Sequence, residues 1–303
     1  MTAGVYSIAP TPFDQSGAVD LTSIDTMTNY YTRCGVHGLT ILGQLGEAAK
    51  LDPDESAAIV KRILDRVQFP VVVGVSAPGF AAMRRLARTV MDLGAGGVMV
   101  APPNTLRTDD QIVDYYAGVV DAIGGDVPFV IQDYPLVFSV QMSVGVIKRV
   151  AQNHSNCVML KHEDWPGLEK ISALRELEHR GEMPRLSILC GNGGLFLDFE
   201  AARGADGAMT GYAFPEMLLE VLALSTTGET DRAHDVFDAH LPLLRYEQQP
   251  GVGLAVRKYV MFRRGIIADD FVRSPGGTLT DTAKAEVDLL MTRLSRRCPE
   301  LRI

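Results

Sequence analysis

Eight short apolar runs recur along the first two thirds of the chain, and they constrain its fold more than any other feature. They are continuous rather than alternating, which is typical of parallel strands whose two faces are both covered. The runs occupy residues 4–9, 38–43, 70–76, 97–101, 128–132, 157–161, 187–191 and 207–211. Eight strand–helix units in about 220 residues predict an α/β fold, a (β/α)8 TIM barrel, with a doubly wound sheet as the alternative.

Helical patterns fill the segments between these runs and continue after the last one. In residues 54–67, Ile59, Ile63 and Val67 share one face at four-residue spacing, and Asp54 is the expected helix cap. After about residue 214, helical patterns follow one another with no strand between them, at 216–225, 230–248, 251–265 and 280–297. We therefore predict a barrel over residues 1–226 and a C-terminal helical extension over residues 227–303.

Composition favours a protein that acts on small molecules. The 303 residues are 47% hydrophobic, enough for a large core, and the formal net charge is −8. Without runs of Lys or Arg, such a chain has no electrostatic footprint for nucleic acid or an anionic membrane. No stretch is long and apolar enough for a membrane helix, and the first residues lack a signal-peptide pattern. We expect a cytoplasmic protein that needs no metal or other cofactor and whose scattered cysteines are reduced.

One lysine stands at the end of an apolar run that reads as a buried strand. Lys161 directly follows residues 157–160, at the end of the predicted sixth strand, where barrel enzymes place their chemistry. The two-residue period of a strand puts Glu163 on the same side as Lys161 and His162 on the other. Apolar surroundings disfavour the ammonium form, and a free amine can attack a ketone to form a Schiff base. The alternative is a structural ion pair with Glu163 or Asp164.

Several segments follow one another in an order that matches a known family. They are "APTPFDQSGAVD", "GQLGEAAKLDPDE", "PVVVGVS", "DLGAGGVMVAPP", "PFVIQDYP", "VMLKHED" and "ILCGNGG". Together they resemble the dihydrodipicolinate synthase / N-acetylneuraminate lyase family of Schiff-base aldolases over nearly the whole chain. The resemblance implies a (β/α)8 barrel with a C-terminal helical extension, usually assembled as a homotetramer. It also implies that Lys161 forms the Schiff base with pyruvate or a related 2-oxo acid.

The resemblance further implies where the substrate binds. The GxxGE loop of the family, here residues 43–47, receives the carboxylate of the 2-oxo acid, and glycines allow backbone N–H groups to converge on an anion. An ordinary tight turn is the alternative for this loop, as it is for the turn at residue 191. Glu47 is expected to cap the helix that follows its loop. The residues expected to contact or line the substrate are Gly43, Gln44, Leu45, Gly191 and Met209.

The chain also departs from the family at positions that handle protons. Gln132 replaces the tyrosine of the relay, Gln44 replaces a loop threonine, and Asn104 stands in place of an aromatic residue. A carboxamide can hold a water or a substrate hydroxyl, but it does not titrate near neutral pH. Tyr134 is no obvious substitute, because its direction cannot be predicted. Val137 stands where the synthases carry the arginine that grips the second carboxylate of their aldehyde substrate.

We therefore predict a Schiff-base lyase or aldolase acting on pyruvate or another 2-oxo acid, and not a true dihydrodipicolinate synthase. Lys161 and Gln132 are the predicted catalytic positions, and Glu163 is an acid–base candidate. A dehydratase of a 2-oxo sugar acid would use the same iminium chemistry, and a non-catalytic binder of 2-oxo acids is a further alternative. A homotetramer or homodimer is expected.

Overall fold

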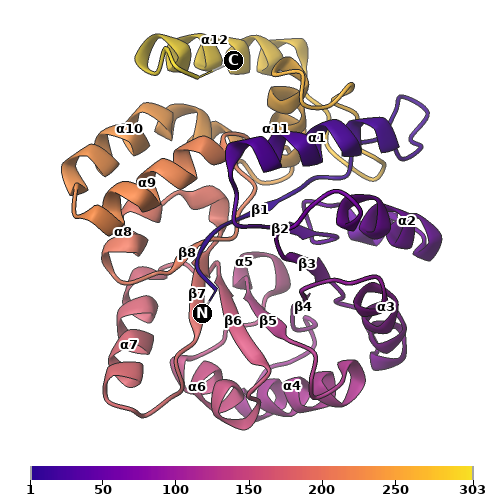
Figure 1. The fold of residues 1–303 in the computed structure, drawn as a ribbon, viewed down its shortest axis with the longest axis vertical. Helices are drawn as coiled ribbons and strands as arrows, with labels where there is room; N and C mark the ends of the chain where they lie inside the picture. The colour runs from indigo at the N-terminus through magenta and orange to yellow at the C-terminus, as the bar shows by residue number, and fades with distance from the viewer. Residues whose placement is uncertain (1, 302–303) are drawn as a thin grey trace.

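The computed structural model describes residues 2–301 and shows a closed barrel of eight parallel strands (Figure 1). Each strand pairs with the next one in sequence, and the last pairs with the first, which confirms the TIM barrel over the doubly wound sheet. The strands are β1 Gly4–Ile8, β2 Gly38–Ile41, β3 Val71–Gly74, β4 Gly97–Val100, β5 Phe129–Asp133, β6 Cys157–His162, β7 Ser187–Cys190 and β8 Gly207–Ala208.

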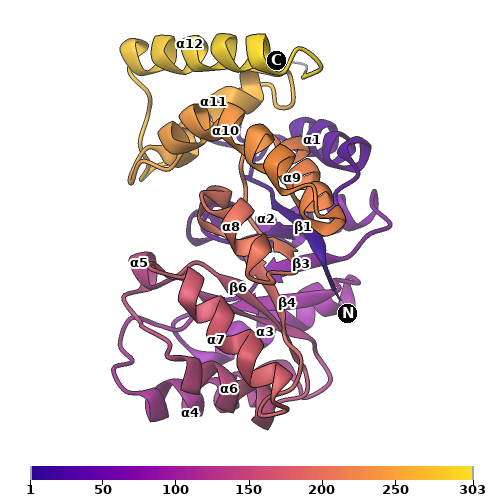
Figure 2. The same cartoon turned by 90° about the vertical axis from the view of Figure 1, so that its left-hand side faces the viewer.

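Helices connect the strands and continue past the barrel. The helices between strands are α1 Leu21–Cys34, η1 Ala48–Lys50, α2 Pro53–Leu64, α3 Phe80–Asp92, α4 Asp109–Ile123, α5 Pro135–Phe138, α6 Val144–Asn153, α7 Leu168–His179, η2 Asn192–Gly194 and α8 Leu197–Ala202. The helices after β8 are α9 Pro215–Thr227, α10 Thr230–Glu247, α11 Gly253–Arg263 and α12 Asp281–Arg297. Figures 1 and 2 show α10, α11 and α12 gathered on the side of the barrel that carries α1 and α9.

The helical run after the barrel is confirmed, because no strand follows β8 within the described residues. Helix α9 ends at Thr227, close to the expected boundary between residues 226 and 227, and that boundary stays a prediction. All the cysteine thiols are free, as expected. Within residues 2–301, no helix has the length and apolar content needed to cross a membrane.

The start of α2 differs from the prediction. Its cap is Asp52 rather than Asp54: the Asp52 carboxylate accepts from the N–H of Glu55, and the Glu55 carboxylate accepts from the N–H of Asp52. Pro53 takes the first helical position, where its missing N–H costs nothing and its fixed φ suits a helix. Because a proline is favoured directly after the cap, the cap lies two residues earlier than expected, and Asp54 lies in the first turn.

The core has two zones, and the inner one positions the site. One set of apolar residues packs between strands and helices, while a smaller set fills the inside of the barrel. Lys161 lies two residues after the inward Met159 on β6, and Gln132 lies two residues after the inward Val130 on β5. The inner set is Tyr6, Ile8, Val72, Met99, Val130, Met159, Leu189 and Met209. Strand alternation therefore directs the predicted catalytic side chains into the barrel.

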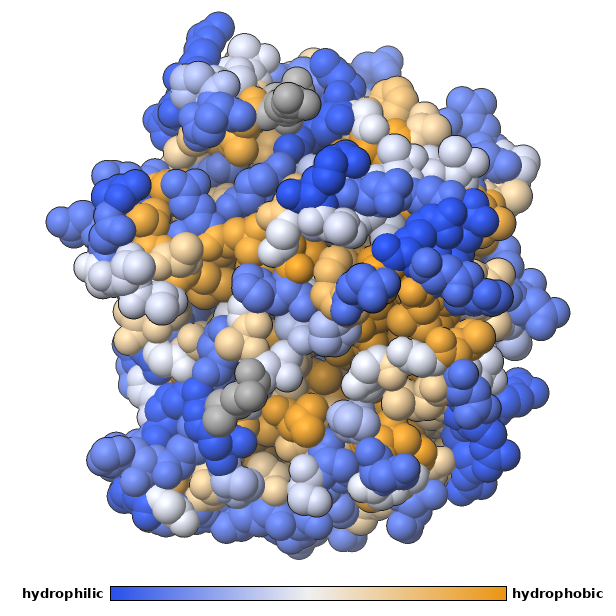
Figure 3. Space-filling model, viewed as in Figure 1, coloured by the Kyte–Doolittle hydropathy of each residue, from blue (hydrophilic) through white to orange (hydrophobic). Residues whose placement is uncertain are grey.

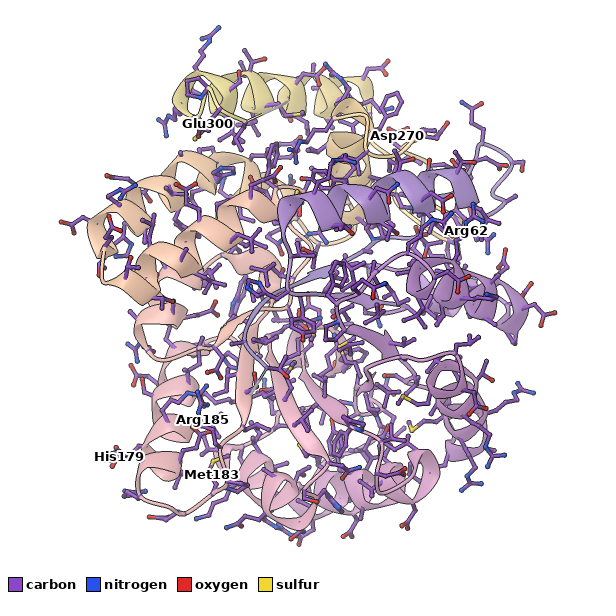
Figure 4. All side chains as sticks on the ribbon, viewed as in Figure 1. Arg62, His179, Met183, Arg185, Asp270 and Glu300 are labelled. Carbon is purple, nitrogen blue, oxygen red and sulfur yellow. The ribbon has the colours of Figure 1, made fainter. Side chains whose placement is uncertain are left out.

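Polar side chains dominate the outline of the face drawn in Figure 3, and apolar side chains gather across its middle. Charged side chains labelled in Figure 4, among them Arg62, Asp270 and Glu300, project from the periphery rather than into the barrel. The carboxylates of Asp270 and Glu300 therefore say little about the charge of the substrate.

Gly38 allows β1 and β2 to pack closely at the start of β2, where it pairs with Tyr6. A methyl group at this position would lie 2.3 Å from Cε1 of the Tyr6 ring. We expect Gly38→Ala to lower the free energy of unfolding by about 1–3 kcal/mol, the usual cost of overpacking a core. Urea unfolding checks this against Gly125→Ala, where an added methyl group meets nothing within 4 Å. Equal stability of the two variants would contradict the packing argument.

Candidate active site

Lys161 lies inside the mouth of the barrel, at the carboxyl end of β6. Its neighbours across the sheet are Gln132 on β5 and Leu189 on β7. Only 4% of Lys161 is exposed, so the side chain is removed from bulk solvent although it carries an amine. A buried lysine at this end of a TIM barrel is placed for chemistry.

A buried carboxylate is the partner of Lys161. The Lys161 ammonium lies 2.7 Å from Oε2 of Glu163, and Nε2 of Gln132 donates to the same oxygen at 3.0 Å. Glu163 is 5% exposed. The ion pair that we gave as the alternative for Lys161 therefore exists with Glu163, whereas Asp164 pairs with Lys170 at 2.6 Å. An ion pair does not exclude reactivity, because the carboxylate can also take the proton that the amine must lose.

Backbone contacts fix Glu163 in this position. Its N–H donates to the carbonyl oxygen of Asp133 (2.9 Å), and Nδ2 of Asn192 donates to the carbonyl oxygen of Glu163 (2.9 Å). A methyl group at Gly191 would lie 2.3 Å from Cγ of Glu163. The turn after β7, which the sequence marked at Gly191, therefore supports the carboxylate that faces Lys161.

The Gly43–Glu47 loop is held by a carboxylate that the structure uses differently from the prediction. Glu47 makes no side-chain capping bond to η1, so that expectation is wrong. Its buried carboxylate accepts instead from Lys50 (2.7 Å), from Lys258 (2.5 Å) and from the backbone N–H of Arg273 (3.1 Å). The carboxylate therefore bonds to these three donors instead of to the N–H groups at the start of η1. The three bonds anchor the loop at the carboxyl end of β2.

A cavity of about 230 Å³ reaches the Lys161–Glu163–Gln132 group through Gln132, while Lys161 and Glu163 are not among its described lining residues. It is lined by three of the predicted residues, Gly43, Gln44 and Gln132, and by Phe138 of α5. Leu45 packs against the inner core of the barrel, and Met209 is fully buried within that core. Leu45 and Met209 therefore support the mouth from inside the barrel and do not line this cavity.

Tyr134 does not complete a hydroxyl relay in this structure. Among residues 2–301, no hydroxyl is hydrogen-bonded to Lys161, Glu163 or Gln132. Burial, followed by the charge of Glu163, raises the pKa of Tyr134 to about 12, and the charge of Arg257 opposes this rise. The phenol near the site thus stays protonated at neutral pH. The other relay position, Asn104, is exposed.

Sequence reasoning placed Glu163 on the correct face but did not identify its central role. The available signal was the pair of carboxylates after Lys161, of which only Glu163 shares its strand face. Glu163, Gln132 and Gly191 follow or end different strands, β6, β5 and β7. Their contacts could therefore not be predicted from the sequence of any one segment.

A second buried carboxylate lies behind this strand. His162 faces away from the barrel interior, and its Nε2 donates to the carbonyl oxygen of Gly167 (3.0 Å). Nearby, Glu200 is 6% exposed, and its Oε2 has no hydrogen-bond partner among the described residues. Burial raises the pKa of Glu200 to about 7, against the charge of His162 and the thiol of Cys190.

A family model agrees with this site and fold. The model described as the dihydrodipicolinate synthetase family matches residues 1–294. The chain belongs to the dihydrodipicolinate synthetase family. The enzymes of this family are lyases and aldolases, so the chain is a Schiff-base lyase in the broad sense, as predicted.

Individual relatives of this family member carry different names. It is 30% identical to L-2-keto-3-deoxyarabonate dehydratase of Azospirillum brasilense, over 96% of this chain and 94% of the relative. It is 58% identical to a dihydrodipicolinate synthase of Rhodopseudomonas palustris known from its crystal structure, with a TM-score of 0.95 over 96% of this chain and 97% of that one. It is 22% identical to a putative 2-dehydro-3-deoxy-D-gluconate aldolase of Escherichia coli, over 96% of both chains.

A substitution at Gly191 tests whether this glycine holds Glu163 in position against Lys161. In Gly191→Ala, the methyl group would push Glu163 away from Lys161, and the rate at which borohydride traps pyruvate on Lys161 should fall about 100-fold. Peptide mass spectrometry over time measures this rate. Gly145→Ala is the matched control, because its methyl group meets only Oγ of Ser143, at 3.5 Å. An unchanged rate in Gly191→Ala would remove the positioning role.

Glu200 predicts a pH-dependent stability. Between its ordinary pKa of 4.5 and its folded value of about 7, folded Glu200 holds a proton that the unfolded chain has released. Stability therefore falls as the pH rises through this range, and Glu200→Gln should relieve a penalty of about 3 kcal/mol at pH 8. The gain should largely vanish at pH 5. Urea unfolding at both pH values checks this, with the exposed Glu220→Gln as control.

Proposed function

We propose that this protein is a Schiff-base dehydratase that removes a hydroxyl group from a 3-deoxy-2-oxo acid. The observation that carries the proposal is the buried Lys161–Glu163–Gln132 group, in which one carboxylate lies within 2.7 Å of the amine. The name of the Azospirillum relative, a 2-keto-3-deoxy acid dehydratase, supports the same reaction class.

The reaction would begin at Lys161. Its neutral amine attacks the C2 carbonyl of the substrate, and the carbonyl oxygen leaves as water to give an iminium. The iminium withdraws electrons from the neighbouring C–H bond, so Glu163 can take a proton from C3 and leave an enamine. The enamine electrons then expel the hydroxyl at C4, which departs as water with the proton from Glu163. Water finally attacks C2, releases the product and restores the amine.

Gln132 acts as a positioning residue in this scheme. Its N–H donates to the Glu163 oxygen that faces Lys161, and a carboxamide cannot itself carry a proton at neutral pH. A single carboxylate would thus accept the proton from C3 and return it to the leaving hydroxyl. The backbone of residues 43–47 would hold the C1 carboxylate, as the family resemblance implies.

The residues after β5 argue against synthase chemistry. Leu136 and Val137 are apolar and 57% and 47% exposed, so no guanidinium at residue 136 or 137 can grip a second substrate carboxylate. Losing such a bidentate contact would cost several kcal/mol of binding. Because the Rhodopseudomonas protein is named a synthase, the aldehyde substrate of the synthases belongs in the assay panel.

Aldol cleavage is the second candidate, supported by the name of the Escherichia coli relative. It would use the same iminium on Lys161, but the electrons would come from a C–C bond, and pyruvate would be released with an aldehyde. Dehydration releases no pyruvate, so product analysis separates the two. Assembly as a homotetramer or homodimer and a cytoplasmic location remain part of the proposal.

The chemical test is trapping with pyruvate and borohydride, followed by assays of 3-deoxy-2-oxo acids. We expect a reduced adduct on Lys161 that is lost in Lys161→Ala. Glu163→Gln should keep the amine but lower kcat for dehydration by about 100- to 10,000-fold, the usual contribution of a general acid–base group. Glu169→Gln, whose carboxylate is exposed on α7, is the matched control.

Each alternative has its own result. An adduct without turnover of any acid in the panel would support the non-catalytic binder. Release of pyruvate from a longer acid would support aldol cleavage. An adduct on another lysine, or an undiminished kcat in Glu163→Gln, would contradict the proposed mechanism.

A further inference from the structure

Arg257 carries a buried hydrogen-bond donor that neither the fold nor the catalytic group uses. It lies on α11 in the C-terminal extension and is 2% exposed. Its Nε (2.7 Å) and its Nη2 both donate to Oε1 of Glu247, the last residue of α10. Nη1, however, has no hydrogen-bond partner among the described residues. Leaving a buried donor unpaired is unfavourable, so a ligand that accepts from Nη1 would be favoured.

Nη1 lies at the mouth of the barrel. Residue 211 follows the inward Met209 by two positions, so a side chain at residue 211 would point inward. This residue is a glycine, and a methyl group added to it would clash with Nη1 of Arg257. The guanidinium therefore occupies the space in which an inward side chain after β8 would lie, and only a glycine leaves that space open.

The loop after β2 lies next to this donor. The same methyl group at residue 211 would lie 2.9 Å from Cδ1 of Leu45 and 3.0 Å from the carbonyl oxygen of Ile8. Leu45 belongs to the loop of residues 43–47, and Ile8 ends β1. Nη1 is thus placed where the ends of β8, β1 and β2 meet, across the barrel from Gln132 on β5.

The charge of Arg257 is also felt on the catalytic side of the mouth. Tyr134 directly follows β5, and burial, followed by the charge of Glu163, raises the pKa of its phenol, whereas the charge of Arg257 lowers that pKa. Both charges act on one phenol. The guanidinium and the catalytic carboxylate therefore belong to the same end of the barrel.

A carboxylate is the ligand group that suits this donor. The N–H groups of a guanidinium bond most strongly to ionised oxygens, and Nη1 carries two of them. Glu247 is bound through Nε and Nη2, so the charge nearest to a ligand at Nη1 is the positive one. The backbone N–H groups that the family resemblance assigns to a carboxylate belong to the neighbouring loop, residues 43–47.

We propose that Arg257 is a substrate-binding residue whose Nη1 donates to the C1 carboxylate of the 2-oxo acid, beside the backbone of residues 43–47. Gly211 is the residue that admits this side chain to the mouth. The inference rests on the proposed function, because the C1 carboxylate is placed relative to a Schiff base on Lys161. The C-terminal extension thereby supplies part of the site, which the barrel alone does not complete.

Borohydride trapping on Lys161 tests this role with pyruvate and with pyruvamide, its uncharged analogue. Arg257→Met should raise the concentration of pyruvate that half-saturates trapping by about tenfold or more, and that of pyruvamide by less than about threefold. A residue that only supports the fold would affect both ligands equally. Arg232→Met removes an exposed arginine of α10 that pairs with Glu229, and this control should leave both concentrations unchanged.

A second variant keeps the Arg257–Glu247 pair in the chain, should Arg257→Met fold poorly. In Gly211→Ala, the methyl group would displace Nη1 from the mouth, so trapping of pyruvate should again weaken more than trapping of pyruvamide. Gly125→Ala is the matched control, because its methyl group meets nothing within 4 Å.

The outcomes separate this inference from the proposed function. Equal losses for pyruvate and pyruvamide, or no loss for either, would overturn the role of Arg257 while leaving the Schiff-base function intact. Weaker trapping of 2-oxoglutarate with unchanged trapping of pyruvate would assign Arg257 to a distal carboxylate and would also overturn it. Failure of the unsubstituted protein to trap any 2-oxo acid would overturn the proposed function, and this inference with it.

Discussion

The ion pair between Lys161 and Glu163 is the interaction on which the site depends. Both side chains are buried, so leaving either charge without the other would be unfavourable. The Gln132 side chain and the backbone N–H of Asn192 also donate hydrogen bonds to the Glu163 carboxylate. The barrel makes this arrangement possible by bringing the ends of β5, β6 and β7 together. In the proposed function, this charge pair moves protons beside the Lys161 amine, whereas in an inert core it would only cost stability.

Much of the fold could be predicted because strand and helix patterns are local. Continuous apolar runs identified all eight strands, and the alternation around Lys161 correctly separated Glu163 from His162. The two helix-cap predictions were wrong because other residues form the hydrogen bonds in question, and a local sequence pattern does not show which residues those are. Asp54 lost the α2 cap to Asp52 because Pro53 follows it, and Glu47 lost its capping role to donors over two hundred residues away in the chain.

The site could be predicted only in outline, because its contacts join residues that are distant in the sequence. A lysine after an apolar strand, with the family resemblance, pointed to Lys161, and the carboxamides at Gln44 and Gln132 marked a departure from a hydroxyl relay. What replaces that relay depends on which side chains meet across strands. The common contact of Gln132 and Lys161 with one oxygen of Glu163 is a property of the closed barrel and of no single segment.

The contact between Glu47 and Lys258 has a consequence for the order in which the protein becomes competent during synthesis. The two residues are 211 positions apart, and Lys258 lies on α11, well after the last strand. A growing chain can therefore pair all eight strands before Lys258, which anchors the loop at residues 43–47, has been made. Domains fold as their segments emerge, so the barrel would stay idle until the C-terminal helices dock. The extension thus acts as the final step of assembly.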